Sequence, residues 1–173
     1  LFRHTRLQTS FPVNMLAMNS GRPEQMGLKD VIAAFCDFRK EVVTRRSVYL
    51  LGKARERAHI LAGLMVALAS IDKIIELIKR APDTETARNE LCARAWPASE
   101  VEAFIRLIDD PGHEVIDGHY KLSETQARAI LDLRLQRLTG MEREKLAEEP
   151  GELAGRISDY LEILGSQSRV DEV

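Results

Sequence analysis

The stretch from residue 28 to residue 69 constrains the fold most, because it predicts one long amphipathic helix. No proline falls between Pro23 and Pro82, and Gly52 and Gly63 stand alone inside the stretch. At 1.5 Å per residue, about 42 residues make a rod of roughly 60 Å. Its apolar residues recur in steps of three and four and form one stripe with a slip near the middle. The stripe comprises Leu28, Val31, Phe35, Val42, Tyr49, Leu50, Ala54, Ala58, Leu61, Met65 and Leu68.

A rod of this length needs a second rod to cover its stripe, and residues 141–164 are the best candidate. Pro150 and Gly151 predict a kink or a break inside this return helix. At about 36 Å it is shorter than the outgoing helix, so it should cover only the distal part, from Tyr49 to Leu68. The N-terminal strands and a helix starting near Ser168 are the candidates to cover the rest. Everything between the two rods would then lie at the far tip of an arm.

Shorter elements are expected before and between the two rods. Residues 11–18 alternate as a strand, Asn19-Ser20-Gly21 is a turn signal, and residues 22–26 return as an edge strand. Helices are expected over residues 71–80, 84–93, 99–108 and 124–138, with capping boxes at Ser99 and Ser123, a corner at Trp96-Pro97 and a small hairpin closed by Asp117-Gly118. The predicted fold class is mainly α: a long antiparallel coiled-coil arm, a small helical globular tip and a short N-terminal β-hairpin.

Composition limits the functions that the chain can have. The 173 residues are 45% hydrophobic and 30% charged, with a formal net charge of −2. This balance argues against a dedicated nucleic-acid binder and a membrane-surface protein. The nearly apolar run 60–69 is too short to span a bilayer, so no membrane partner is expected. Cys36 and Cys92 form no CxxC motif, which fits a reducing, cytoplasmic location. The chain begins at Leu1 and stops in a charged stretch, which is typical of an excised piece of something larger.

The helix expected over residues 124–138 carries the most functional information, because it has two apolar faces. A tip helix needs only one such face to attach to its own chain, and a second one suggests a partner. The alternative is a helix buried on two sides within one chain, and the pattern favours neither. One face comprises Ala127, Leu131, Leu135 and Leu138, and the other comprises Ile130 and Leu133 beside Arg134 and Arg137.

Several strings of residues are those of a known family. They include RKEVVTRR at 39–46, KARERAHIL at 53–61 and ARAILDLRLQRLTGM at 127–141. On these strings the chain resembles the A subunits of bacterial DNA gyrase, a type IIA topoisomerase, over nearly its whole length. RKEVVTRR and Thr139-Gly140 favour the gyrase protein over its topoisomerase IV counterpart. Pro150 departs from the unbroken helix of the family, and residues 83–119 match least.

The resemblance implies a domain organisation that agrees with the one derived from the residues. Residues 1–27 would end a tower domain, 28–70 form the outgoing helix, 71–140 form a globular exit-gate tip, and 141–173 form the return helix and the start of a truncated helix. The tip would meet its twin across a two-fold axis, so the chain would be a homodimer. The implied interface comprises Ala127, Ile130, Leu131, Leu133, Arg134, Leu135, Arg137, Leu138, Thr139, Gly140 and Met141.

The resemblance also implies the setting in which the chain works. The whole enzyme would be an A2B2 assembly with gyrase B subunits, acting on double-stranded DNA. It would pass one duplex through another at the expense of ATP and introduce negative supercoils, with ATP and Mg in the gyrase B subunits and the DNA gate. This chain would itself hold no cofactor and no metal. A run of basic residues on the outgoing helix has two interpretations: it would face the duplex cavity, or it would be a solvated flank of the arm. The solvated flank is preferred. The run comprises Arg39, Lys40, Arg45, Arg46 and Lys53.

Catalysis in this family uses a tyrosine nucleophile preceded by an arginine. The three tyrosines, Tyr49, Tyr120 and Tyr160, follow a valine, a histidine and an aspartate. None matches, so the chain is expected to lack catalytic residues. Tyr49 lies near two arginines, but we interpret it as a core aromatic on the apolar stripe.

Two other classes of protein stay open at this point. One is an unrelated helical adaptor that dimerises through the same tip. The other is a small metal-dependent enzyme, although a solvated polar loop is preferred because the spacing of the candidate ligands matches no defined pattern. Those candidates are Asp109, Asp110, His113, Glu114, Asp117 and His119.

Overall fold

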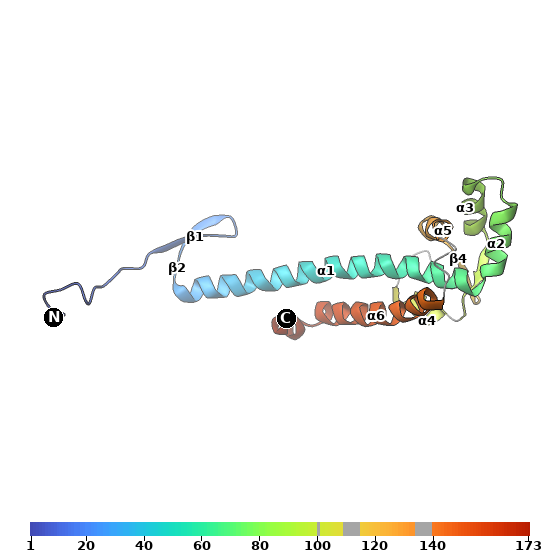
Figure 1. Ribbon diagram of the computed structural model, residues 1–173. Helices are drawn as coiled ribbons and strands as arrows, with labels where there is room; N and C mark the ends of the chain where they lie inside the picture. The colour runs from blue at the N-terminus through green and yellow to red at the C-terminus, as the bar shows by residue number, and fades with distance from the viewer. Residues whose placement is uncertain (100, 109–114, 134–139) are drawn as a thin grey trace.

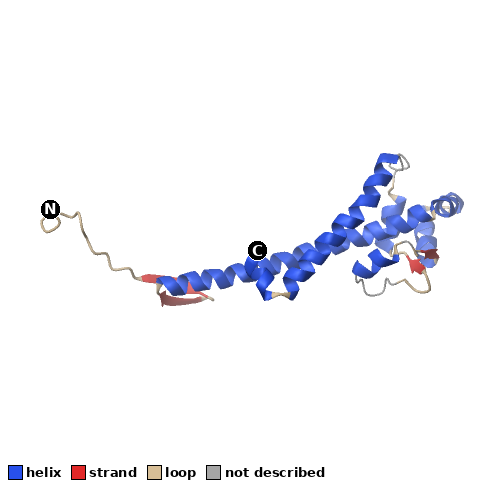
Figure 2. Ribbon diagram, turned by 90° about the horizontal axis from the view of Figure 1, so that it is seen from below, coloured by secondary structure: helices blue, strands red, loops and turns tan. Residues whose placement is uncertain are grey.

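The computed structural model describes residues 1–99, 101–108, 115–133 and 140–173, and for residues 140–147 it describes the backbone alone. Figure 1 shows an elongated body built on one long helix, α1 (Leu28–Ala69), as the sequence predicts. An N-terminal hairpin lies at one end of α1, and a group of short elements lies at the other. Strands occur at both ends of the arm (Figure 2). The predicted fold class, mainly α with a long arm and a small β-hairpin, is confirmed.

The hairpin pairs β1 (Met15–Asn19) with β2 (Arg22–Met26) in antiparallel register, with Asn19 opposite Arg22. Ser20 and Gly21 have φ of 49° and 79°, as a two-residue type I′ turn requires. The predicted turn is therefore confirmed. The first strand begins at Met15 rather than at residue 11, because only residues that face β2 have a hydrogen-bonding partner.

The return helix, α6 (Gly140–Gly165), packs along the distal half of α1. Its Leu153 and Ile157 are buried in the same core cluster as Ala58 and Leu61 of α1. Of the predicted kink or break at Pro150, the break is wrong, since α6 continues through it, and the kink stays a prediction. Pro150 is buried, so we attribute the continuity to packing, which outweighs the loss of one backbone N–H donor.

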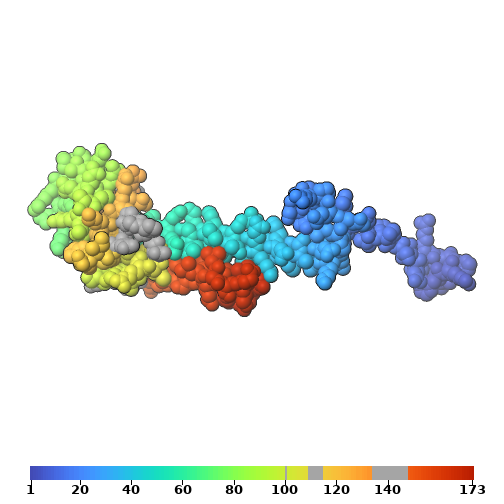
Figure 3. All heavy atoms as spheres, turned by 180° about the vertical axis from the view of Figure 1, so that it is seen from behind, coloured from blue at the N-terminus to red at the C-terminus, as the bar shows by residue number. Residues whose placement is uncertain are grey.

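The predicted register of the arm is confirmed by the segment that follows α6. Figure 3 shows that the C-terminal elements cover the distal half of α1 and stop short of the hairpin. The short helix α7 (Gln167–Glu172) comes next, with Val170 buried and Asp171 3.0 Å from the ammonium of Lys40. This pairing raises the pKa of Lys40 and lowers that of Asp171. A helix near Ser168 therefore lies beside α1 at Lys40, as predicted, but it does not cover Phe35, which stays exposed.

The apolar stripe of α1 is buried only where α6 covers it. Phe35 is 61% exposed and Tyr49 is 63% exposed, so the prediction that Tyr49 is a core aromatic is wrong. The buried stripe runs through Ser47 and Leu51 instead, and it rejoins the predicted stripe at Ala54. The sequence pattern misplaced this part of the stripe, because steps of three and four allow two different sets of residues to continue it near the middle of the helix. Only the position of α6 decides which set is buried.

A bidentate ion pair ties the two helices of the arm together. Glu149 accepts hydrogen bonds from Nε and Nη2 of Arg57 at 2.6 and 2.9 Å. These bonds raise the pKa of the Arg57 side chain. The two residues are 92 positions apart in the sequence, so the pair fixes the register of α6 on α1.

Replacing Arg57 with alanine is expected to lower the free energy of unfolding by about 0.5–1 kcal/mol. Solvent screens a half-exposed ion pair, which keeps the loss small, but the two parallel hydrogen bonds of the bidentate pair make the loss measurable. Urea denaturation at low and at high salt measures the change, which salt should reduce. Lys53→Ala is the matched control, since Lys53 pairs with Glu56 within α1 and bridges no two helices. Equal losses for the two variants would contradict a special role for the pair.

Among the described residues, the tip packs six short elements around the far end of α1. They are α2 (Ile71–Arg80), α3 (Thr84–Ala93), β3 (Ala95–Pro97), α4 (Glu102–Ile108), β4 (His119–Lys121) and α5 (Glu124–Leu131). The bounds of α2 and α3 are as predicted. Trp96 and Tyr120, both 1% exposed, are among the largest buried side chains of the molecule.

Two details of the tip differ from the prediction. Trp96-Pro97 is not a corner, because Trp96 lies in β3 and pairs with Tyr120 of β4. Helix α4 begins at Glu102, with its first bond from Ile105 N–H to Val101 O at 3.0 Å, so Ser99 lies before its start. The predicted hairpin at Asp117-Gly118 is confirmed, with φ of 51° and 73° and Ile116 bridged to His119.

Candidate functional site

Helix α5 is shorter than the sequence predicts. It ends at Leu131 rather than at residue 138. The N–H of Asp132 bonds to the carbonyl of Arg128 at 2.9 Å, and the N–H of Leu133 bonds to that of Ile130 at 3.2 Å. The second bond spans only three residues and tightens the last turn, which ends the helix.

The structure does not separate the two predicted apolar faces of α5, because each face has one buried and one half-buried residue. Gln126 and Ala127 are 0% exposed and Ile130 is 6% exposed within the single chain. Ala127 and Ile130, both predicted at the dimer interface, are thus covered by the core of their own chain, and their part in an interface stays a prediction. Leu131 and Leu133 are half-buried at the edge of that core, and part of each side chain stays accessible.

Most of the other residues predicted at the interface cannot be placed. Arg134, Leu135, Arg137, Leu138 and Thr139 lie outside the described residues. Gly140 and Met141 open α6, and only their backbone is described. Among the predicted interface residues whose side chains the structure describes, Leu131 and Leu133 are half-buried and the others are buried.

A buried amide joins α5 to α1. The Nε2 of Gln126 donates to the carbonyl of His59 at 2.6 Å, and its Oε1 accepts from the N–H of Ser123 at 2.9 Å. The hydroxyl of Tyr120 lies 2.8 Å from Nε2 and 3.2 Å from Oε1. His59 Nε2 lies 2.7 Å from the hydroxyl of Ser123. The capping box at Ser123 is confirmed, but the sequence did not reveal that its glutamine is fully buried.

A glycine of α1 makes room for this amide. A Cβ on Gly63 would lie 2.7 Å from both Cβ and Cγ of Gln126. An isolated glycine inside a helix often has such a packing reason, so Gly63 was the available sequence signal for a close contact.

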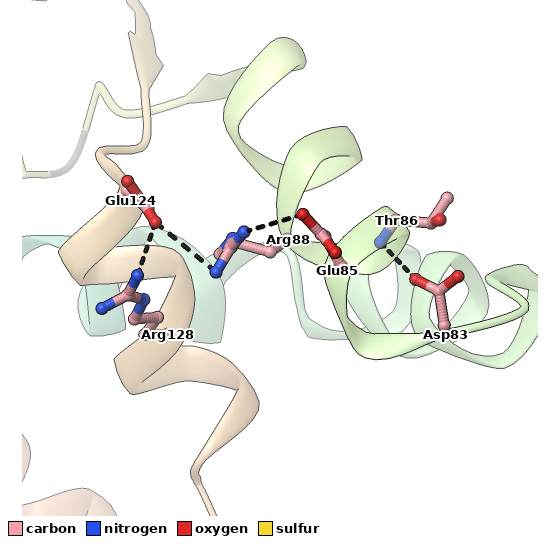
Figure 4. A network of polar contacts seen from close by, with 6 residues as sticks. All are labelled: Asp83, Glu85, Thr86, Arg88, Glu124 and Arg128. Carbon is pink, nitrogen blue, oxygen red and sulfur yellow. Dashed lines mark hydrogen bonds and ion pairs between the residues drawn. The ribbon is translucent and has the colours of Figure 1, made fainter.

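Helix α5 also contacts α3 through charged residues, shown in Figure 4. Glu124 lies 2.6 Å from Arg128 on its own helix and 3.4 Å from Arg88 on α3. Arg88 also approaches Glu85 at 3.6 Å. At the start of α3, Asp83 accepts from the N–H of Thr86 at 2.6 Å, which lowers the pKa of that carboxyl. Because Glu124 and Arg128 are largely exposed, these pairs contribute little to stability.

Three of the five residues of the basic run on α1 pair with carboxylates. Lys40 pairs with Asp171, Arg45 lies 3.5 Å from Glu41, and Lys53 lies 2.8 Å from Glu56. The ammonium of Lys53 also lies 6.0 Å from the ring centroid of Tyr49. Arg39 and Arg46 are exposed. The pairing with carboxylates supports a solvated flank over a continuous DNA-binding face.

The candidate metal loop lies largely outside the described residues, which include neither Asp109 and Asp110 nor His113 and Glu114. Asp117 and His119 are described, and Nδ1 of His119 lies 2.9 Å from the carbonyl of Asp117. Where residues are described, no group of three or more His, Cys, Asp or Glu side chains is placed to hold a metal ion. The described helices likewise include none long and apolar enough to cross a membrane.

Comparison with known proteins relates the whole chain to one family. A family model for the A subunits of DNA gyrase and topoisomerase IV matches residues 1–173. The DNA gyrase A protein of Granulibacter bethesdensis is 50% identical over 174 residues, which cover 100% of this chain and 18% of that protein. Its Rickettsia bellii counterpart is 49% identical over 173 residues, and its Salmonella typhimurium counterpart is 50% identical over 182 residues. They too match over 100% of this chain, and over 19% and 21% of their own length.

The chain spans about a fifth of the length of these curated relatives. The match nevertheless extends from its first residue to its last, over the hairpin, both arm helices and the tip. The chain therefore belongs to the family of DNA gyrase and topoisomerase IV A subunits.

Proposed function

We propose that this chain is the coiled-coil arm and exit-gate tip of a DNA gyrase A protein. The supporting observation is the position of the tip: α2 to α5 lie at one end of a 42-residue helix, and the hairpin lies at the other. In this proposal residues 1–27 end the tower domain, 28–70 and 141–173 build the arm, and 71–140 form the gate. The relatives at about 50% identity are gyrase A proteins, which favours gyrase over topoisomerase IV.

The proposed setting is a cytoplasmic A2B2 enzyme that passes one DNA duplex through another. Gyrase B subunits would supply ATP hydrolysis, and the result would be negative supercoiling. A duplex that has crossed the DNA gate would enter the space between two arms and leave where the two tips meet. The role of this chain would be to hold that exit closed and to let it open.

The proposed dimer contact is the edge of α5 together with the segment that leads into α6. Leu131 and Leu133 provide apolar surface there, and the predicted residues 134–141 would extend it. A two-fold contact is self-complementary, so this edge would meet its own copy. Because a gate must open in every cycle, the contact should be modest in area and bordered by charges, such as those of Arg128 and Asp132.

Analytical ultracentrifugation of the chain tests this proposal. We expect a dimer at micromolar concentration, and Leu133→Asp and Leu131→Asp are expected to give folded monomers, because a charge at a buried two-fold contact faces its own copy. Ile78→Asp is the control, since Ile78 is an exposed aliphatic residue of α2 away from this edge. Circular dichroism separates monomers from unfolded chains. A wild-type chain that stays monomeric at high micromolar concentration would contradict the proposal.

The chain is expected to have no DNA cleavage or ATPase activity of its own. Tyr120 is buried and bonded to Gln126, Tyr160 is half-buried, and Tyr49 lies beside Lys53 and follows a valine. Incubation with supercoiled DNA and Mg²⁺, followed by denaturation and mass spectrometry, would detect a phosphotyrosyl adduct. A whole gyrase serves as the positive control. An adduct on any of the three tyrosines would refute the expectation.

A further inference from the structure

We propose that Gln126 and Gly63 form a lock that positions α5 on α1, and with it the proposed dimer surface at Leu131 and Leu133. The role of that surface rests on the function proposed above. The lock itself rests on contacts within the chain. Gln126 is thus a positioning residue, because its side chain is fully buried within its own chain.

The lock is directional, because a buried amide needs its partners at fixed places. Gln126 uses both ends of its amide: Nε2 donates to the carbonyl of His59, and Oε1 accepts from the N–H of Ser123. Tyr120 lies within hydrogen-bond distance of both ends. Moving α5 along α1 would leave a buried donor without its acceptor, which is unfavourable in an apolar interior.

The lock is also matched in size. His59 and Gly63 are four residues apart on α1 and share one face of the helix. His59 contributes the carbonyl, and Gly63 contributes the space, since a Cβ there would overlap three side-chain atoms of Gln126 at 2.7–2.9 Å. One turn of α1 therefore recognises one side chain of α5 by both hydrogen bonding and shape.

The other attachments of α5 do not fix its position as closely. Ala127 and Ile130 make apolar contacts, which are not directional. The pairs of Glu124 with Arg88 and Arg128 lie on the surface and adjust with their flexible side chains. Leu131 belongs to the same helix as Gln126 and Leu133 follows two residues later, so a shift of α5 would carry both leucines with it. The lock consequently determines whether Leu131 and Leu133 of one copy of the chain can pack against the same residues of a second copy.

The test compares Gln126→Glu with Ile130→Val in the whole chain. The glutamate keeps the size of the side chain and an acceptor, but it places a carboxylate oxygen against the carbonyl of His59. Ile130→Val removes one methyl group from the same helix and leaves the lock intact. Tyr120→Phe, which removes one hydroxyl, is a milder second variant if the glutamate variant does not fold. Sedimentation measures the dimer dissociation constant, and hydrogen exchange measures protection of the α5 amides.

We expect Gln126→Glu to raise the dissociation constant and the exchange rate of the α5 amides by about tenfold or more, with exchange in α1 and α6 unchanged. Tyr120→Phe should change both in the same direction by less, and Ile130→Val should change the dissociation constant by under about twofold. Wild-type exchange and dimerisation in a folded Gln126→Glu chain would overturn the proposal, as would global unfolding of both lock variants without separate loosening of α5. If the wild-type chain is monomeric, the gate proposal fails, and the α5 exchange alone still decides for or against the lock.

Discussion

Replacing Gly63 with alanine is expected to destabilise the chain by about 1–3 kcal/mol, although alanine is the better helix former. In an open helix the change would stabilise by up to about 1 kcal/mol, because glycine loses more backbone entropy on folding. Here the new methyl group would lie 2.7 Å from two atoms of Gln126, closer than carbon atoms can approach. Gln126 is bonded at both ends of its amide, so it cannot move aside without losing a hydrogen bond.

Gly52→Ala is the matched control for this prediction. Gly52 lies in the same helix, and no atom lies within 4 Å of the position that its Cβ would take. The control is expected to raise the free energy of unfolding, so the two variants should change it in opposite directions. Urea denaturation at one protein concentration measures both, since dimerisation would make stability depend on concentration. A stabilised Gly63→Ala variant would show that α5 does not pack against α1 at this place.

Replacing Ile157 with alanine is expected to lower the free energy of unfolding by about 2–5 kcal/mol. Ile157 is 0% exposed, and it belongs to the core cluster in which Ala54 and Ala58 of α1 lie. Alanine side chains are too short to move into the space that the isoleucine would leave. The substitution should therefore leave a cavity between the two rods of the arm.

Leu161→Ala, one turn further along α6, is the control for the arm. Leu161 is 40% exposed, so its truncation removes less buried surface and should cost under about 1 kcal/mol. Thermal unfolding followed by circular dichroism at one concentration ranks the two variants. Equal effects would mean that α6 packs on α1 through a different face.

Local chemistry explains which parts of the fold the sequence could predict. The bounds of α1, α2 and α3 follow from caps and from the absence of proline, and the turn at Ser20-Gly21 follows from its glycine. These signals act over a few residues and need no tertiary contact. The start of the return helix followed from the stop signal at Thr139-Gly140, and its register on the distal half of α1 followed from the unequal lengths of the two rods.

The errors concern positions at which tertiary packing decides. Pro150 did not break α6. Tyr49 was placed in the core because the periodicity of the sequence cannot show which of two neighbouring rows of residues on α1 a second helix will cover. The pairing of Trp96 with Tyr120 joins three-residue strands 24 positions apart, too short and too distant for an alternation pattern. Gln126 was interpreted only as a capping residue, although its side chain also bonds to α1.

The unequal lengths of the two arm helices have a mechanical consequence. Two rods that cannot slide past each other resist bending more than the sum of two separate rods, and the Arg57–Glu149 bridge and the interlocked core oppose sliding. Beyond Lys40, toward the hairpin, α1 extends past α7, and the elements described beside it there are the strands of the hairpin rather than a second helix. Bending is therefore easiest over residues 28–39. A force applied at the tip would rotate the two-helix part of the arm and the tip together about these residues.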